Sequence, residues 1–458
     1  MYAKSNLTCL AALAAAPLLA GFAVAQESVS LPETSVLQSE ASAPYVAPPT
    51  EFLIVRRAEL IDSIGAGVFL LRSSSARDLE TDYLQDSDFR QNNDFFFLTG
   101  IEVADSWLLL DVPREGNPST TLFIPERDPA QEQWTGPRPS LKSAATITGI
   151  ADVQVVAVAE AAVRAAFARA AEAGDPVYTS ENQRAAHDPM LQRLLADATT
   201  EVHDAGPLVA QLRLIKDEFE LAMLQRAIDI TASTHRAAMR SMRPGMYEYE
   251  TEAVIEYNFR AGGAERVGFP SILGSGPNSV VLHYDRSRRI MEAGELVVMD
   301  IGADYSYYTA NVTRTVPVSG TFTDRQRAIY DLVLGSQQAG IDVVRPGITM
   351  RDVDRASREY MRVHSGDLCG EQTCDAYFIH GIGHWLGMDV HDVGSYATPF
   401  APGMVLTVEP GIYLAGENLG VRIEDDVLVT ETGSRVMSSA PRNADAIEAL
   451  MHRGMEMR

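Results

Sequence analysis

Residues His380 to Gly394 read HGIGHWLGMDVHDVG, a stretch that holds three of the nine histidines of the chain. His380 and His384 have the spacing of the helical zinc motif, but no Glu follows His380, and two glycines disfavour a helix. The interpretation as a helical zinc peptidase is therefore excluded. Three imidazoles beside a glycine-rich turn favour a site over isolated structural histidines, and His283, which ends another apolar run, is a further candidate.

Acidic side chains end apolar runs on either side of this stretch. Asp300 follows Leu296–Met299, and Glu409 follows Val405–Val408. A buried carboxylate without a partner is costly, so each needs a cation or strong hydrogen-bond donors. Taken alone, Asp300 is equally compatible with an ion pair to Arg422.

A third acidic segment lies near the C-terminus. Residues Val421–Val429 are predicted to form one buried strand, in which a period of two places Arg422, Glu424 and Asp426 on one face. Three carboxylates with one imidazole form an oxygen-rich set that suits manganese, iron(II) or cobalt and also accommodates zinc. Such a site lowers the pKa of water, and peptide hydrolysis is a natural use of it.

The pattern of helices and strands predicts two folded domains in the 458 residues, an N-terminal α/β domain and a C-terminal α+β domain. The predicted divisions are residues 1–25, 26–49, 50–206 and 207–458. The predicted helices cover 51–64, 159–173, 213–243 (with Arg213, Lys216 and Glu220 at helical spacing), 248–261, 324–340 and 350–363. The predicted strands cover 67–72, 106–111, 279–283, 296–302, 309–317, 405–408 and 421–429.

Composition restricts the partners. The formal net charge of −24 argues against nucleic acid and anionic membranes, because the summed field repels both. A cation is easier to accommodate.

The first 25 residues have the pattern of a signal peptide. An early Lys4 precedes an apolar run that closes on small residues and predicts cleavage after Ala25. The run is shorter than the roughly 20 residues of a membrane anchor. Residues 26–49 then form a predicted flexible linker. The protein is therefore expected to be secreted or periplasmic, where Cys369 and Cys374 can form a disulfide, although free thiols are an alternative.

Five segments resemble the aminopeptidase P and prolidase family of Xaa-Pro metallopeptidases. They are HGIGHWLG with the following MDVHDVG, TVEPGIY around Glu409, VRIEDD around Glu424, VVMDIGADY around Asp300, and DFRQNNDFFFLTG from Asp88 to Gly100. The resemblance implies a creatinase-like N-terminal domain, a C-terminal domain of the "pita-bread" fold, and a site for two Mn²⁺ ions. It also implies removal of the first residue from peptides with proline second.

Roles follow from the resemblance position by position. Asp300, His384, Glu409 and Glu424 are implied metal ligands, and Glu409 also moves the proton. His283 and His391 hold the substrate carbonyl, His380 lines the pocket, and Arg422 orients a ligand carboxylate. Phe96 occupies the place of an aromatic that reaches a neighbouring subunit in similar proteins, which implies a homo-oligomer.

One position departs from the family. Asn311 stands where the resemblance implies a metal-bridging Asp, although the flanking residues match. A carboxylate bridges two cations through both oxygens, whereas an amide offers one oxygen and an NH₂ group. The hypothesis is weakened metal occupancy. The alternatives to an Xaa-Pro aminopeptidase are a prolidase that cuts dipeptides and a catalytically impaired relative that binds peptides.

Overall fold

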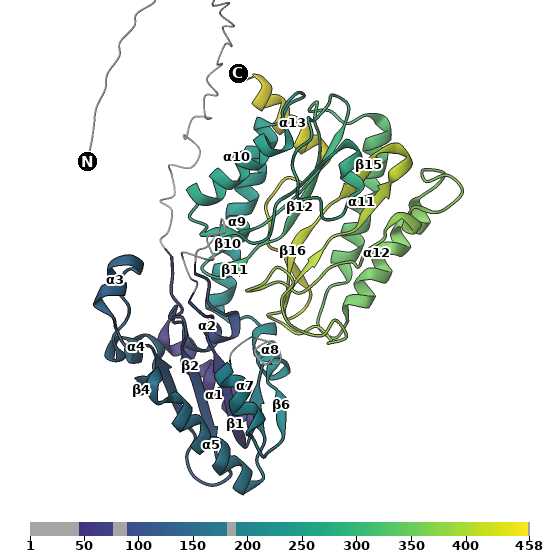
Figure 1. The fold of residues 1–458 in the computed structure, drawn as a ribbon. Coiled ribbons are helices and arrows are strands. Elements are labelled where there is room, and N and C mark those ends of the chain that lie inside the picture. The colour runs from purple at the N-terminus through teal and green to yellow at the C-terminus, as the bar shows by residue number, and fades with distance from the viewer. Residues whose placement is uncertain (1–44, 77–88, 181–188, 457–458) are drawn as a thin grey trace, which may run out of the picture. The chain divides into compact units, whose positions relative to one another are not determined.

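The N-terminal half is built on one mixed sheet in a computed structural model that describes residues 45–76, 89–180 and 189–456 (Figure 1). Its strands follow the order β4-β3-β2-β1-β5-β6. Their bounds are β1 (Gly67–Arg72), β2 (Trp107–Val112), β3 (Ser119–Ile124), β4 (Asp152–Val155), β5 (Val177–Thr179) and β6 (Val202–Asp204). The helices are α1 (Thr50–Ile64), α2 (Asn93–Thr99), α3 (Pro129–Thr135), α4 (Leu141–Thr148), α5 (Ala159–Ala173) and α7 (Pro189–Ala196).

Alternating side chains of β1 explain why helices lie on both faces of this sheet. Val68 and Leu70 join a buried cluster with residues of α5 and α7, whereas Phe69 and Leu71 join the cluster that contains residues of α1. A strand buried on both faces reads as a continuous apolar run, as the sequence of β1 does.

The C-terminal half divides its strands among small sheets. The orders are β11-β10-β7, β12-β9-β8, β13-β16-β17 and β14-β15. Their bounds are β7 (Arg266–Val267), β8 (Ile272–Ser275), β9 (Leu296–Ile301), β10 (Ala303–Tyr305), β11 (Tyr308–Thr309), β12 (Val312–Pro317), β13 (Val405–Val408), β14 (Gly411–Leu414), β15 (Leu419–Arg422), β16 (Asp425–Val429) and β17 (Ser434–Val436). The helices are α8 (Gly206–Leu214), α9 (Glu218–Ser241), α10 (Glu248–Ala261), α11 (Asp324–Val343), α12 (Met350–His364) and α13 (Ala444–Glu456).

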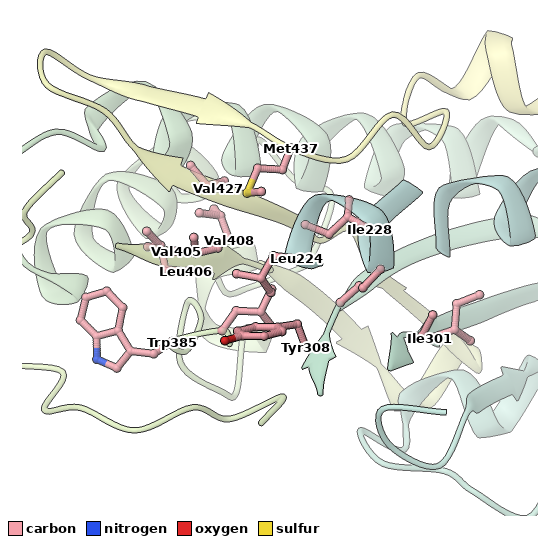
Figure 2. Close-up of a cluster of buried hydrophobic side chains, with 14 of the residues drawn as sticks. Leu224, Ile228, Ile301, Tyr308, Trp385, Val405, Leu406, Val408, Val427 and Met437 are labelled. Atoms are coloured by element: carbon pink, nitrogen blue, oxygen red, sulfur yellow. The ribbon is translucent and has the colours of Figure 1, made fainter. Parts of the chain in front are cut away.

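Apolar side chains of helix α9 and of the strands β13 and β16, which are distant in the sequence, belong to one buried cluster. Figure 2 shows Leu224 and Ile228 of α9 in the same cluster as Val405, Leu406 and Val427. These residues are all fully buried. The cluster fixes the strands whose ends carry Glu409 and Glu424.

The prediction of one helix from Arg213 to Arg243 is wrong. Helix α8 ends at Leu214, and α9 begins at Glu218 after Asp217, whose side chain accepts the backbone N–H of Glu220 while Glu220 bonds back to the N–H of Asp217. This capping box starts a new helix despite the helical spacing of the charges.

Three strand predictions also need correction, and two of them lie between residues 279 and 317. Residues 279–283 do not form a strand, because a 3-10 turn (Gly276–Val280) with Gly276 at φ +49 occupies the start of this segment. The predicted strand 309–317 is interrupted at Ala310 and Asn311, between β11 and β12.

The predicted strand 421–429 is two strands. Arg422 pairs with Gly411 of β14, whereas Asp425 pairs with Val408 of β13. The chain therefore passes from one sheet to another at Ile423 and Glu424. A continuous period of two does not apply across this crossing.

Several contacts join the two halves. Arg56 of α1 bonds Asp217 at 2.7 Å, and Arg90 bonds Asp304 at 3.1 Å. Residues 42–458 accordingly form one compact unit, and the boundary at residue 206 stays a prediction. Residues 1–44 lie outside the described residues, and with them the predicted signal peptide and most of the predicted linker. Across the described ranges, no helix combines the length and the apolar character needed to cross a membrane.

Cys369 and Cys374 form a disulfide, with an S–S distance of 2.09 Å. The pairing favoured from sequence is confirmed. It closes a short loop between α12 and the segment that leads to His380.

Candidate metal centre

Four separate segments bring the predicted ligands together. Asp300 lies in β9 and pairs with Thr313 of β12. Strand β12 begins directly after Asn311. Glu409 comes after the last residue of β13, and Glu424 precedes β16, the partner strand of β13. The backbone N–H of Glu424 donates to the Thr313 carbonyl at 3.1 Å, which joins the two pairs of strands.

His384 reaches this place on an extended segment that lies against β13. The Thr407 N–H donates to the His384 carbonyl at 2.9 Å, and Trp385 forms a β-bridge with Leu406. A Cβ atom on Gly383 would collide with the Thr407 carbonyl. The glycine that excluded a helix in this motif therefore allows close approach to the strand.

His384, Glu409 and Glu424 form a compact ligand cluster. The distance from His384 Nε2 is 3.6 Å to Glu409 Oε1 and 3.9 Å to Glu424 Oε1, and one ligand atom from each residue lies within 4.8 Å of the other two. His384 Nδ1 lies 3.0 Å from the Trp385 carbonyl, which can only accept, so Nδ1 carries the proton. Nε2 then presents its lone pair to the cluster.

Unpartnered acceptors show that the residues fit a cation. The atoms Asp300 Oδ1, Asn311 Oδ1, Glu424 Oε1 and Asp426 Oδ1 are buried and accept no hydrogen bond. Burial raises the pKa of Glu409 to about 8, and burial together with Glu409 and Asp300 raises the pKa of Glu424 well above its usual range. A metal ion would satisfy these acceptors and favour their charged forms.

Asp300 stands apart from the three-residue cluster. Its Oδ2 accepts from Arg422 at 2.8 Å, so the ion pair considered from sequence is present. Arg422 also donates to the Tyr413 hydroxyl at 3.0 Å, and both side chains are buried. The guanidinium of Arg422 therefore holds one carboxylate of the site in place.

Asn311 is buried at the cluster. Its Nδ2 lies 3.2 Å from His384 Nε2, and its backbone N–H donates to Asp426 Oδ2 at 3.4 Å. Burial and the neighbouring Asp425 raise the pKa of Asp426 well above its usual range. Arg422, Glu424 and Asp426 thus all lie around the site, although they do not share one continuous strand.

The three other histidines border the cluster. The ring centroids of His384 and His391 lie 4.2 Å apart. His380 Nδ1 donates to the Gly381 carbonyl, so Nε2 accepts from the Tyr413 hydroxyl at 2.8 Å. Burial and then the charge of Arg422 lower the pKa of His380, and burial lowers that of His391. His283 adds a smaller electrostatic effect at both rings, so it lies in their neighbourhood.

Phe96 does not reach the site. Its ring is 1% exposed and stacks on Tyr307 with ring centroids 3.8 Å apart. The expectation that this side chain extends into a neighbouring subunit is not met, because Phe96 packs in the core of its own chain. The predicted homo-oligomer stays a prediction.

Sequence reasoning missed three contributors. Tyr413 lies within the quoted TVEPGIY motif but was not singled out, and its hydroxyl connects His380 to Arg422. Arg213 and Lys216 both bind Asp392, the neighbour of His391, at 2.5 and 3.2 Å. The helical spacing of Arg213 and Lys216 gave no signal for this role, since their partner lies more than 170 residues later.

A cavity of 430 Å³ opens beside His391. Its lining includes Arg90 and Arg266 as well as Asp304 and Asp389. Charged groups of both signs line it, and two of them, Arg90 and Asp304, form an ion pair with each other.

Comparison with known proteins places this geometry in a family. Residues 222–431 match the family model of metallopeptidase family M24, and residues 53–173 match that of the N-terminal domain of aminopeptidase P. A Xaa-Pro aminopeptidase of Escherichia coli (strain K12) is 34% identical over 437 residues, which cover 86% of this chain and 96% of the relative. The chain belongs to metallopeptidase family M24.

Solved structures show the same M24 architecture. Proline aminopeptidase P II from Yersinia pestis has a TM-score of 0.82 and 32% identity, covering 89% of this chain and all of that chain. Zinc-substituted E. coli aminopeptidase P in complex with product has a TM-score of 0.81 and 31% identity, covering 89% and 99%. The predicted fold, an aminopeptidase P-like N-terminal domain followed by a pita-bread M24 domain, is confirmed.

Proposed function

We propose that the protein is a metal-dependent Xaa-Pro aminopeptidase, which removes the first residue from peptides with proline in the second position. The cluster of His384, Glu409 and Glu424, with its unpartnered buried acceptors, carries the proposal. The likeness to relatives named Xaa-Pro aminopeptidase supports this specificity over a prolidase.

The residues around the cluster have distinct tasks. A bound divalent ion supplies polarisation of the scissile carbonyl and a lower pKa for water. Glu409 accepts the proton of the attacking water and delivers it to the leaving nitrogen of proline. His283 and His391 donate hydrogen bonds to the substrate carbonyl as it gains negative charge.

Arg422 and Tyr413 hold the side chains of the site in their relative positions. Arg422 joins Asp300 to Tyr413, and Tyr413 joins Arg422 to His380. The pKa of His380 is lowered to about 4 by burial and by the charge of Arg422. His380 therefore stays neutral near pH 7 and lines the pocket without adding charge.

Manganese is the proposed metal. Two carboxylates and one imidazole suit Mn²⁺, and Co²⁺, Fe²⁺ and Zn²⁺ are accommodated by the same set. A solved relative holds zinc by substitution, which supports such exchange in this family. Activity after chelation and reloading with each ion ranks the metals.

Cleavage of Arg-Pro-Pro tests the activity. The purified protein reloaded with Mn²⁺ is expected to release arginine from this peptide, to leave Arg-Ala-Pro intact, and to lose activity in excess chelator. An enzyme that cuts Arg-Pro but not Arg-Pro-Pro is instead a prolidase. Failure to cut either peptide with any of the four ions, together with measurable binding of Arg-Pro-Pro, identifies the impaired peptide-binding relative.

We also propose that the protein acts outside the cytoplasm, in the periplasm or secreted. The signal-peptide pattern of residues 1–25 supports this location. The disulfide between Cys369 and Cys374 supports it too, since such bonds persist in oxidising compartments. N-terminal sequencing of the protein from its native host is expected to begin at Gln26; an intact Met1 contradicts the proposal.

A further inference from the structure

We infer that this chain holds one divalent ion rather than two, bound by His384, Glu409 and Glu424 with the side-chain oxygen of Asn311. Asp300, the carboxylate that a second ion would need, is already paired with Arg422. This inference rests on the proposed metal-dependent function, and it concerns the number of ions and their ligands.

The first position has its ligands in place. His384 Nε2, Glu409 Oε1 and Glu424 Oε1 surround one point, and Nε2 is free of its proton. Asn311 Nδ2 lies 3.2 Å from the same nitrogen, so a half-turn of the amide brings Oδ1 to this side. The turn replaces the contact of Asn311 Nδ2 with His384 Nε2, whose lone pair then faces the ion, and Asn311 Oδ1 itself has no donor to lose.

The second position lacks a bridging group. Glu424 Oε2 accepts from the Thr313 hydroxyl at 2.6 Å, and Asp300 Oδ2 accepts from Arg422 at 2.8 Å. Asp300 Oδ1 is then the one oxygen of the Asp300 carboxylate without a partner. Once the amide oxygen of Asn311 faces the first ion, its NH₂ group faces away from that ion and cannot bind a cation.

The charges of the site also favour one ion. The guanidinium of Arg422 neutralises Asp300, to which it is bonded while both are buried. Glu409 and Glu424 then supply two negative charges, which one divalent ion neutralises. A second ion would bring two positive charges that Asp300 does not offset, since Arg422 already neutralises this carboxylate.

Metal stoichiometry tests the inference without an activity assay. The full chain is stripped with chelator, reloaded with Mn²⁺, desalted and measured by elemental mass spectrometry, while titration calorimetry counts the sites. Wild type is expected to bind one Mn²⁺ per chain and Asn311→Asp two. The electron paramagnetic resonance spectrum is expected to change from that of an isolated Mn²⁺ to that of a spin-coupled pair. Asn443→Asp, which adds the same charge at an exposed helix cap, is expected to stay at one.

Two further variants keep the test decisive if Asn311→Asp does not fold. Asp300→Asn is expected to retain one ion, because Asp300 is not a ligand of the first position. Asp426→Asn is also expected to retain one. Two ions in wild type, or loss of the ion in Asp300→Asn or Asp426→Asn, would overturn the inference. So would a single ion in a folded Asn311→Asp protein.

Failure of the proposed function gives a different pattern. One ion per chain without cleavage of Arg-Pro-Pro leaves the single-ion site intact and contradicts the peptidase alone. Two ions with cleavage support the peptidase and contradict the single-ion site.

Discussion

Asp175 in the N-terminal domain and Glu424 in the C-terminal domain are both completely buried, but their carboxylate oxygens differ in the donors that they have. Asp175 Oδ1 accepts from Arg114 at 2.5 Å, and its Oδ2 accepts from Arg169 at 2.9 Å. Glu424 has one oxygen on the Thr313 hydroxyl and the other without a donor. The first carboxylate is neutralised by the chain itself, and the second is left for an ion from outside.

The pKa shifts follow the same division. Hydrogen bonds from Arg114 and Arg169 lower the pKa of Asp175, whereas burial raises that of Glu424. A buried carboxylate with every oxygen paired is therefore structural. One with a bare oxygen beside a neutral histidine is a candidate for metal binding.

The largest expected effect comes from His384→Ala, which removes the nitrogen ligand of the site. Metal binding is expected to be lost, and activity on Arg-Pro-Pro to fall by more than the roughly 100-fold cost of losing an outer partner of a metal site. Elemental analysis and kcat/KM measure both losses. His203→Ala, a control in the N-terminal sheet, is expected to change neither; retained metal in His384→Ala would remove this residue from the ligand set.

Replacing Asp175 or Glu424 by its neutral amide is expected to change stability in different ways. Asp175→Asn loses charged hydrogen bonds and is expected to lower stability by about 2 kcal/mol with or without metal. Glu424→Gln is expected to leave the chelated protein nearly unchanged, because Glu424 Oε1 has no donor to lose, but to abolish stabilisation by Mn²⁺. Thermal unfolding with chelator and with Mn²⁺ separates the two; equal losses in both variants would erase the distinction.

Asp392 resembles Asp175, because Arg213 and Lys216 bind its two oxygens. Burial alone would raise the pKa of Asp392, but these two cations lower it. Asp392→Asn is expected to shift the neighbouring His391 and to lower kcat about tenfold, with metal content unchanged. Asp389→Asn is the matched control, since Asp389 is a half-exposed partner of Arg213. Wild-type kcat in Asp392→Asn would contradict the positioning of His391.

His235 is the basic counterpart of these buried carboxylates and gives the smallest effect. Its Nε2 donates to the Val312 carbonyl, its Nδ1 has no partner, and burial lowers its pKa to about 3. The unfolded chain, with a pKa near 6.5, binds the proton more readily, so stability falls as pH drops below about 6.5. Between pH 7 and 6 this group accounts for a loss of less than about 1 kcal/mol.

Denaturant unfolding of the chelated protein between pH 7 and 6 measures the loss of stability caused by His235. In His235→Gln, whose amide can still donate to the Val312 carbonyl, this loss of stability is expected to vanish. An unchanged pH profile in that variant would assign the loss to other groups.

Local patterns predicted much of this molecule. The apolar runs before Asp300 and Glu409 identified β9 and β13, since a strand buried on both faces needs little context to be recognised. The capping box at Asp217 and the crossing at Ile423 and Glu424 were missed. Both depend on hydrogen bonds that compete with a simple period, so spacing alone could not reveal them.

The sequence by itself determined the family, the ligand types and the exceptional Asn311, because these are properties of residue identity and spacing. Only the tertiary structure decided which carboxylates already have a cation. Asp300 has Arg422, whereas Glu424 keeps a bare oxygen beside His384 Nε2. The physical reason is that a buried charge is stabilised by the donors that surround it in space, and these come from strands far apart along the chain.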